Sequence, residues 1–227
     1  MSASPMAALS GALVVEIAGE RVWLLPQHAA YWERKRTLLV ADAHIGKAAT
    51  FRAVGIPVPR GTTRGTLDRL SSAIAATSAA RVVFLGDLLH AREGRDVRTL
   101  ETLVEWRRSW AGVEMVLVRG NHDRGAGDPP PEADIGCVSP PLWADPLLFS
   151  HHPHADVRGH VIAGHLHPAA VLLGTARQRE RLPCFWLRAD VSVLPAFGDF
   201  TGVAEIAGAE GDRVYGIAEG KVLALAP

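Results

Sequence analysis

Short apolar segments recur along the chain, and five of them, between residues 37 and 163, are followed within three residues by Asp, His or Asn. Each has the length of a β-strand, and several are apolar throughout, which is typical of strands buried on both faces of a sheet. In α/β proteins, ligands bind in the crevice beyond the carboxyl ends of such strands. We therefore expect polar residues that are far apart in the sequence to meet there. The five segments and the residues after them are 37–41 with Asp42 and His44, 81–85 with Gly86 and Asp87, 113–118 with Gly120, Asn121, His122 and Asp123, 147–149 with His151 and His152, and 161–163 with Gly164, His165 and His167.

The segments between and after these strands predict an α/β fold. Residues 62–77 are expected to form a helix capped by Thr62 or Thr63, and its apolar face carries Leu67, Leu70 and Ile74. A second helix is expected over 96–109, with Val97, Leu100, Val104 and Trp106 on one face. Further strands are expected at 12–17, 21–25, 185–187, 191–194 and 202–206. Helices alternate with strands only in the first two-thirds, so we expect an α/β sandwich that ends in short antiparallel strands, all in a single domain of residues 1–227.

Charge and cysteine content narrow the function classes. The 24 Lys and Arg residues balance the 24 Asp and Glu residues, which excludes a basic protein that coats nucleic acid but not an enzyme with a local positive surface. Cys137 and Cys184 are too few for a disulfide framework and are typical of a reducing compartment. No apolar run approaches the roughly 18 residues of a membrane span, and the N-terminus lacks the basic start of a secretory signal. We therefore expect a cytoplasmic protein without a membrane segment.

The residue types after the five strands are those of a metal centre. Carboxylate oxygens, imidazole nitrogens and an amide oxygen suit Mn²⁺, Fe or Zn²⁺ better than Ca²⁺, which prefers oxygen alone. Asp42 and His44 are two residues apart, as are His165 and His167, so on an extended strand each pair points the same way. Asp87, on a Gly-Asp turn, can bridge two ions. Glycines at 86, 120 and 164 allow the tight turns.

Each motif taken alone also fits a structural role, such as a capped strand end, an Asn-containing turn or a pair of core histidines. Their occurrence together, each after an apolar strand, indicates instead a hydrolase with two metal ions. Two ions about 3.5–4 Å apart can activate water and hold phosphate oxygens.

Together the five motifs resemble the signature of the calcineurin-like metallophosphoesterases, over about residues 37–168. The resemblance implies a four-layer αββα sandwich of two mixed β-sheets, with a dinuclear metal centre at the sheet edge. It also implies that His122 faces the phosphate and assists the leaving oxygen, and that Asp123 orients His122. The implied ligands are Asp42, His44, Asp87 and His167 for one ion and Asp87, Asn121, His151 and His165 for the other, with Asp87 bridging.

Longer segments resemble one group within that family, the bacterial ligase-associated DNA damage response endonucleases (the PdeM group). These segments are ADAHIGKAA at 41–49, FR at 51–52, GIPVP at 55–59 and LPAFGDFTG at 194–202. The resemblance implies a phosphodiesterase that cleaves nucleic acid and works with a DNA ligase, a helicase and an exonuclease-like repair protein. We found no chemistry in the residues of 197–202 themselves.

Four further residues are candidates for binding the substrate. Lys47, Arg52 and Arg124 are cations near the motifs and can contact phosphates, although a solvated surface role also fits each of them. His152 either contributes to the substrate pocket or points away from it, since His151 is the residue that closes the strand. His90 is equally consistent with the pocket rim and with a partly buried turn.

Two alternatives to a nucleic-acid phosphodiesterase remain at this point. The same centre serves a phosphatase or pyrophosphatase of small nucleotides, and a non-catalytic scaffold on this fold could recruit a repair partner. A scaffold is expected to lack ligands, whereas here every ligand position is filled. Ligand types alone do not fix the metal; we expect two divalent ions, Mn²⁺ first, with Fe or Zn²⁺ as alternatives.

Overall fold

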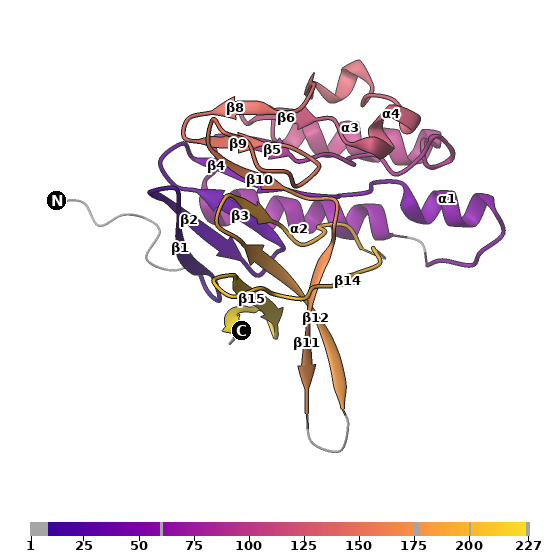
Figure 1. The fold of residues 1–227 in the computed structure, drawn as a ribbon. Helices are drawn as coiled ribbons and strands as arrows, with labels where there is room; N and C mark the ends of the chain where they lie inside the picture. Colours follow the sequence, from indigo (N-terminus) through magenta and orange to yellow (C-terminus); the bar gives the residue numbers. More distant parts are fainter. Residues whose placement is uncertain (1–8, 60, 175–177, 200, 226–227) are drawn as a thin grey trace.

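The computed structural model describes residues 9–59, 61–174, 178–199 and 201–225, and its chain forms two mixed β-sheets (Figure 1). In the first sheet, antiparallel strands from the N-terminus lead into parallel strands connected by helices. Its strands in spatial order are β1 (Leu13–Ile17), β2 (Glu20–Leu25), β3 (Ala29–Trp32), β4 (Thr37–Val40), β5 (Arg81–Phe84), β6 (Glu114–Val118) and β7 (Gly136–Val138). β4 to β7 pair in parallel, so their carboxyl ends lie at the same edge.

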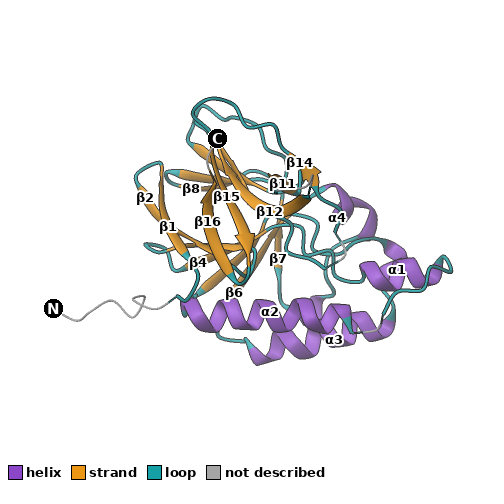
Figure 2. Ribbon diagram, turned by 90° about the horizontal axis from the view of Figure 1, so that it is seen from below, coloured by secondary structure: helices purple, strands orange, loops and turns teal. Residues whose placement is uncertain are grey.

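Two helices, α2 (Thr62–Thr77) and α3 (Val97–Ser109), pack on the first sheet and lie on one side of the strands in Figure 2. Leu67, Leu70 and Ile74 of α2 are buried as expected. The shorter elements are α1 (Lys47–Ala53), α4 (Asn121–Ala126) and the 3₁₀ turns η1 (Arg92–Gly94) and η2 (Pro131–Ala133). α1 begins three residues after His44, and α4 begins at Asn121 within the predicted motif itself, so both helices start at the same sheet edge.

The second sheet contains both parallel and antiparallel pairs. Its strands in spatial order are β14 (Ala204–Glu205), β11 (Pro168–Leu173), β12 (Arg179–Leu187), β13 (Val191–Val193), β10 (His160–Ala163), β9 (Leu147–Phe149) and β8 (Leu142–Ala144), and β12 also pairs with β15 (Arg213–Ala218), which pairs with β16 (Lys221–Leu225). β9, β10 and β13 are parallel. The hairpin of β11 and β12 projects from the body of the molecule (Figure 1).

The two sheets share an apolar core. Trp32 of β3 meets Phe149 of β9 edge to face, with ring centroids 6.0 Å apart. Side chains alternate along the strands of the second sheet, so Phe149 and Ile162 face this core while Leu148 and Val161 lie in a separate cluster. The expected α/β class, with two mixed sheets and flanking helices, is confirmed.

Some local expectations are corrected. Asp96 caps α3, because its carboxylate accepts a 2.6 Å hydrogen bond from the Thr99 N–H. The buried face of α3 is formed by Thr99, Leu103, Trp106 and Arg107, whereas Val97 is 72% exposed. The N-cap of α2 is Gly61 rather than Thr62 or Thr63.

Two observations concern the expected absence of disulfides and of membrane-spanning helices. Both cysteines, Cys137 and Cys184, are free. Among the described residues, none of the helices has the length and apolarity needed to cross a membrane. Phe200, within the 194–202 segment, lies outside the described residues.

Candidate metal centre and active site

The backbone at the predicted ligands is unusual. Asp42, His44, Asp87, His165 and His167 all have positive φ, between 45° and 72°. Non-glycine residues adopt this region at a cost of order 1–3 kcal/mol each when the surroundings enforce it, and such residues cluster at functional sites. The expectation that each pair lies on an extended strand is therefore wrong. β4 ends at Val40 and β10 at Ala163, and left-handed turns aim the ligands instead.

The three glycines expected to allow tight turns act mainly by leaving space. A Cβ atom on Gly120 would collide with the Asp87 carboxylate, and one on Gly164 would collide with the Asp42 carboxylate. Neither of these two glycines has a positive φ. Gly86 is required both for its backbone conformation, with a φ of 83°, and for space, because a Cβ there would collide with the His151 ring.

The first group of donors contains Asp42, His44 and His167, whose ligand atoms lie within 4.8 Å of one another. The Asp42 Oδ2 atom accepts a 2.8 Å hydrogen bond from the His165 N–H, and its Oδ1 atom is buried without a hydrogen-bond partner in the described structure. The Nδ1 atom of His167 lies 3.0 Å from the Gly202 carbonyl oxygen. A carbonyl only accepts, so Nδ1–H donates and the lone pair of Nε2 faces Asp42 Oδ1, 3.5 Å away.

The second group contains Asp87, Asn121, His151 and His165. The Nδ1–H of His151 donates to the Leu85 carbonyl oxygen at 2.9 Å, which leaves the lone pair on Nε2. That Nε2 atom lies 2.8 Å from Asn121 Oδ1, 3.1 Å from His165 Nδ1 and 3.4 Å from Asp87 Oδ2. Potential ligand atoms from four residues therefore converge on one place, which is the arrangement that a transition-metal ion binds.

These two donor groups fit a pair of metal ions. The fit rests on the partnerless oxygen of Asp42, on the convergent lone pairs around His151 and on the carbonyls that hold the outer nitrogens of His151 and His167, as is common for metal-bound histidine. Asp42, Asp87 and His151 also form a group within 4.8 Å, so the two donor groups are contiguous.

Burial shifts the pKa values of several side chains in the two donor groups. It raises the pKa of Asp87 to about 6, helped by the nearby Asp42 carboxylate and opposed by His151. Burial, together with the charge of Lys47, lowers the pKa of His44 to about 2, so this imidazole is neutral and able to ligate. Burial also acts to lower the pKa of His167, but the Asp42 carboxylate outweighs it and the pKa is raised. A divalent cation between these groups favours ionised carboxylates and neutral imidazoles.

Asp123 has a different role from the one expected. Its buried carboxylate accepts backbone N–H bonds from Asp87 at 2.7 Å, Leu88 at 3.0 Å and Gly120 at 2.8 Å. It thus holds the turn after β5 against the start of α4. The His122 ring is oriented by another group, because its Nδ1 atom lies 2.7 Å from the His90 carbonyl oxygen. The expectation that Asp123 orients His122 is corrected on this evidence.

His90, which the sequence left open, belongs to the site. Its ring stacks on His122 with centroids 4.9 Å apart, and its Nδ1 atom lies 3.2 Å from His44 Nδ1. From the sequence, only its residue type marked His90 as a candidate, because it lies in no motif and follows β5 by several residues. The Nε2 atom of His122 lies 3.9 Å from Asp87 Oδ2, and 39% of the His122 side chain is exposed, so the ring is open to a substrate.

Three of the four predicted substrate-binding residues border the centre. Lys47 is half-buried, and burial lowers its pKa against the attraction of Asp42 and Asp87. His152 lies beside His165, with ring centroids 4.2 Å apart, and together with His151 the two form a further group able to hold a metal. The charge of Arg124 contributes, after burial and His151, to a lowered pKa of His152. Arg52 instead lines a neighbouring cavity.

The segment after β13 supports the first donor group. The N–H groups of Phe197 and Gly198 donate to the carbonyls of Ala41 and Asp42, at 2.8 and 3.0 Å. Arg69 of α2 holds the segment in place, since it donates a hydrogen bond to the Phe197 carbonyl and forms an ion pair with Asp199 at 3.0 Å. The segment 196–202 thus positions Asp42 through backbone contacts and His167 through Gly202, which gives a physical role to residues in which the sequence showed no chemistry.

Known proteins resemble this chain in sequence and in structure. Residues 35–183 match the family model described as calcineurin-like phosphoesterase. The crystal structure of Pseudomonas putida nuclease MPE is similar, with 43% sequence identity, a TM-score of 0.84, and coverage of 94% of this chain and 100% of that chain. YfcE, a phosphoesterase from E. coli, matches with 15% identity and a TM-score of 0.37 over 82% of this chain and 95% of its own. No curated protein matches the chain.

The chain belongs to the calcineurin-like phosphoesterase family, since the family model covers well over half of it. It is a hydrolase that acts on phosphoester bonds. The resemblance to this family expected from the five motifs is confirmed.

The contact between residues 196–202 and the first donor group leads to a prediction for Gly198→Ala. A Cβ atom on Gly198 would collide with the Ala43 carbonyl, so the turn carrying Asp42 and His44 must shift. We expect Mn²⁺ binding to weaken by roughly 10-fold or more, measured by calorimetric titration of the chelated protein.

Gly202→Ala is the matched control, because a Cβ atom there meets nothing within 4 Å and the Gly202 carbonyl is retained. Equal Mn²⁺ affinity in the Gly198→Ala and Gly202→Ala proteins would contradict the positioning role of the segment.

Proposed function

We propose that this protein is a manganese-dependent phosphodiesterase with two metal ions that cleaves nucleic acid. The observation that carries the proposal is the convergence of carboxylate, imidazole and amide acceptors into two contiguous donor groups. The similar structure at 43% identity is a nuclease, which supports a polynucleotide substrate. The resemblance of residues 41–59 and 194–202 to the ligase-associated group supports the same substrate.

The proposed ligands follow the two groups. Asp42, His44 and His167 would hold one ion, and Asn121, His151 and His165 would hold the other. Asp87, which groups with both Asp42 and His151, would serve both ions. Bound divalent ions supply charge neutralisation at the phosphate and lower the pKa of water toward neutrality. Mn²⁺ suits this mixed oxygen and nitrogen donor set, with Fe and Zn²⁺ as alternatives.

The protein's own side chains then position the phosphate. The Lys47 ammonium has no hydrogen-bond or ion-pair partner among the described residues, and it is placed to bind a phosphate oxygen. His152 lies beside His165 of the second donor group, and the charge of Arg124 acts on His152, so both side chains are available to bind phosphate oxygens. Phosphoryl transfer depends mainly on such positioning and charge neutralisation.

His122 is the proposed acid–base residue. With Nδ1–H donated to the His90 carbonyl, Nε2 is the atom that faces the centre. The ring is partly exposed, so Nε2 can reach a bound substrate and pass a proton to the leaving oxygen as the P–O bond breaks. Asp123 is proposed to act indirectly, since the hydrogen bonds that it accepts from the Asp87 and Gly120 N–H groups fix the loops that carry Asp87 and His122.

The biological setting is part of the proposal. We place the enzyme in DNA repair, where a DNA ligase, a helicase and an exonuclease-like protein are the expected partners, and where the chain acts as a single unit over residues 1–227. The two free cysteines support a location in the reducing cytoplasm.

Hydrolysis of bis-p-nitrophenyl phosphate tests this function. The chelated protein supplied with Mn²⁺ should hydrolyse this diester faster than p-nitrophenyl phosphate, the monoester. Asp87→Asn should abolish the activity because it removes the proposed bridging charge. Asp190→Asn, at an exposed turn, is the matched control and should retain it. Preference for the monoester would contradict the proposal and favour a phosphatase of small nucleotides.

His122→Ala separates catalysis from metal binding. We expect kcat on the diester to fall by about 10²–10⁴-fold, while bound manganese, measured by inductively coupled plasma mass spectrometry, stays at the wild-type ratio because His122 is not among the proposed ligands. His154→Ala removes an exposed imidazole nearby and should leave kcat unchanged. Loss of manganese from the His122→Ala protein would show that His122 ligates the metal.

A further inference from the structure

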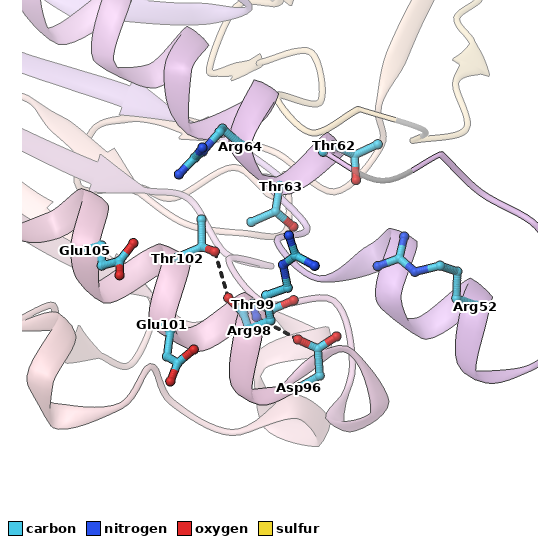
Figure 3. A pocket seen from close by; sticks show the side chains of 11 residues that line it. Arg52, Thr62, Thr63, Arg64, Asp96, Arg98, Thr99, Glu101, Thr102 and Glu105 are labelled. Atoms are coloured by element: carbon cyan, nitrogen blue, oxygen red, sulfur yellow. Dashed lines mark hydrogen bonds between the residues drawn. The ribbon is translucent and has the colours of Figure 1, made fainter.

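A cavity of about 650 Å³ lies between α1, α2 and the start of α3 (Figure 3). Three arginines from three different helices line it: Arg52 of α1, Arg64 of α2 and Arg98 of α3. Thr62 and Thr63 add hydroxyl groups from the first turn of α2. The lining is therefore rich in donors that recognise anions.

Two of these arginines face one another. Figure 3 shows the guanidinium groups of Arg52 and Arg98 pointing toward each other across the cavity. Among the described residues, neither forms an ion pair, and the one hydrogen bond of Arg52 is a 3.5 Å contact with the Pro59 carbonyl. Two like charges directed into one space are stabilised by an anion placed between them. A planar guanidinium also matches phosphate geometry with two parallel hydrogen bonds.

The carboxylates on the cavity wall leave this pair of arginines available. Asp96 is engaged as the N-cap of α3, where it accepts the Thr99 N–H at 2.6 Å. Glu101 and Glu105 lie further along α3, toward the end of the cavity away from Arg52 (Figure 3). Positive charge is thus concentrated where α1 approaches the start of α3.

The cavity is connected to the metal centre by two short segments. α1 begins at Lys47, beside Asp42 and Asp87, and reaches Arg52 after five residues, which is about 7.5 Å along a helix axis. The other segment runs from His90 through η1 to Arg98, and η1 packs on α1 with Gly94 against the Gly46 carbonyl. A polymer with a phosphate at the metal centre therefore has its neighbouring phosphates within reach of this cavity.

We propose that the cavity binds a backbone phosphate of the nucleic-acid strand next to the bond that is cleaved, through Arg52 and Arg98. This inference rests on the proposed function. Such a contact holds the strand in register and carries no base sequence information. It also explains why Arg52 lies away from the donor groups although it is adjacent in sequence to the first motif.

The test compares two double variants of equal charge. Arg52→Ala with Arg98→Ala removes the proposed contact. Arg92→Ala with Arg108→Ala removes two exposed arginines from η1 and from the last turn of α3. Binding of a labelled single-stranded DNA oligonucleotide is measured by fluorescence anisotropy on chelated protein, and hydrolysis of bis-p-nitrophenyl phosphate is measured with Mn²⁺.

We expect the Arg52 and Arg98 double variant to bind the oligonucleotide about 10-fold or more weakly than the control double variant. The slope of log affinity against log salt should flatten by about 0.7, the value for one lost phosphate contact with a single strand. Hydrolysis of the small diester should be unchanged, because that substrate has no second phosphate. The Arg98→Lys single variant keeps a positive charge at this position and should bind the oligonucleotide more tightly than the Arg52 and Arg98 double variant.

Equal affinity and equal salt slope in the two double variants would overturn the subsite. A parallel loss of small-diester hydrolysis would also overturn it, since the arginines would then act on the metal centre or the fold. Failure of the proposed function is seen separately, as a wild-type protein that does not hydrolyse the diester.

Discussion

The structure depends on two carboxylates buried side by side. Asp42 is 0% and Asp87 2% exposed, and burying charge without compensation costs far more than an ordinary contact returns. The compensation comes from backbone N–H groups, from imidazoles and, in the proposed holoenzyme, from two divalent cations. The surrounding glycines, left-handed turns and carbonyl-bound histidines all serve to bring these two carboxylates to the same place.

Neither sheet provides the centre alone. β4, β5 and β6 deliver Asp42, Asp87 and Asn121, while β9 and β10 of the second sheet deliver His151 and His165. Contacts that join the sheets therefore matter to the chemistry, and the 196–202 segment is one of them, because it bonds to the backbone on both sides of Asp42. Within the first sheet, Asp123 fixes the backbone at Asp87 by accepting hydrogen bonds from the Asp87 and Leu88 N–H groups. The strain at the left-handed ligands is maintained by this network rather than by local sequence preference.

Much of this centre could be predicted from the sequence, because each ligand follows an apolar strand and parallel strands end at a common edge. The same reasoning located β4, β5, β6, β9 and β10 to within a residue at either end. The ligand roles themselves remain predictions, while the placement of the seven residues in two contiguous groups is observed.

Other features depend on contacts that no local pattern carries. The extended geometry assumed for Asp42 and His44 fails, since tertiary contacts enforce left-handed backbone there. The roles of Asp123 and His90 arise from hydrogen bonds between segments more than 30 residues apart. Arg52 is expected from the sequence only as a cation near the first motif that can contact phosphates, and its position in the cavity is set by α1. From the sequence, no strand is predicted at β3, β7, β8, β11, β15 or β16 either. β7 and β8 have only three residues each, which is too short for a pattern to show.

Anomalous diffraction at the manganese edge, from crystals grown with Mn²⁺, tests the dinuclear centre most directly. We expect two peaks roughly 3.5–4 Å apart, one among Asp42, His44 and His167 and the other among Asn121, His151 and His165, with Asp87 between them. A single peak, or a peak held by His44, His90 and His122 instead, would contradict the dinuclear centre.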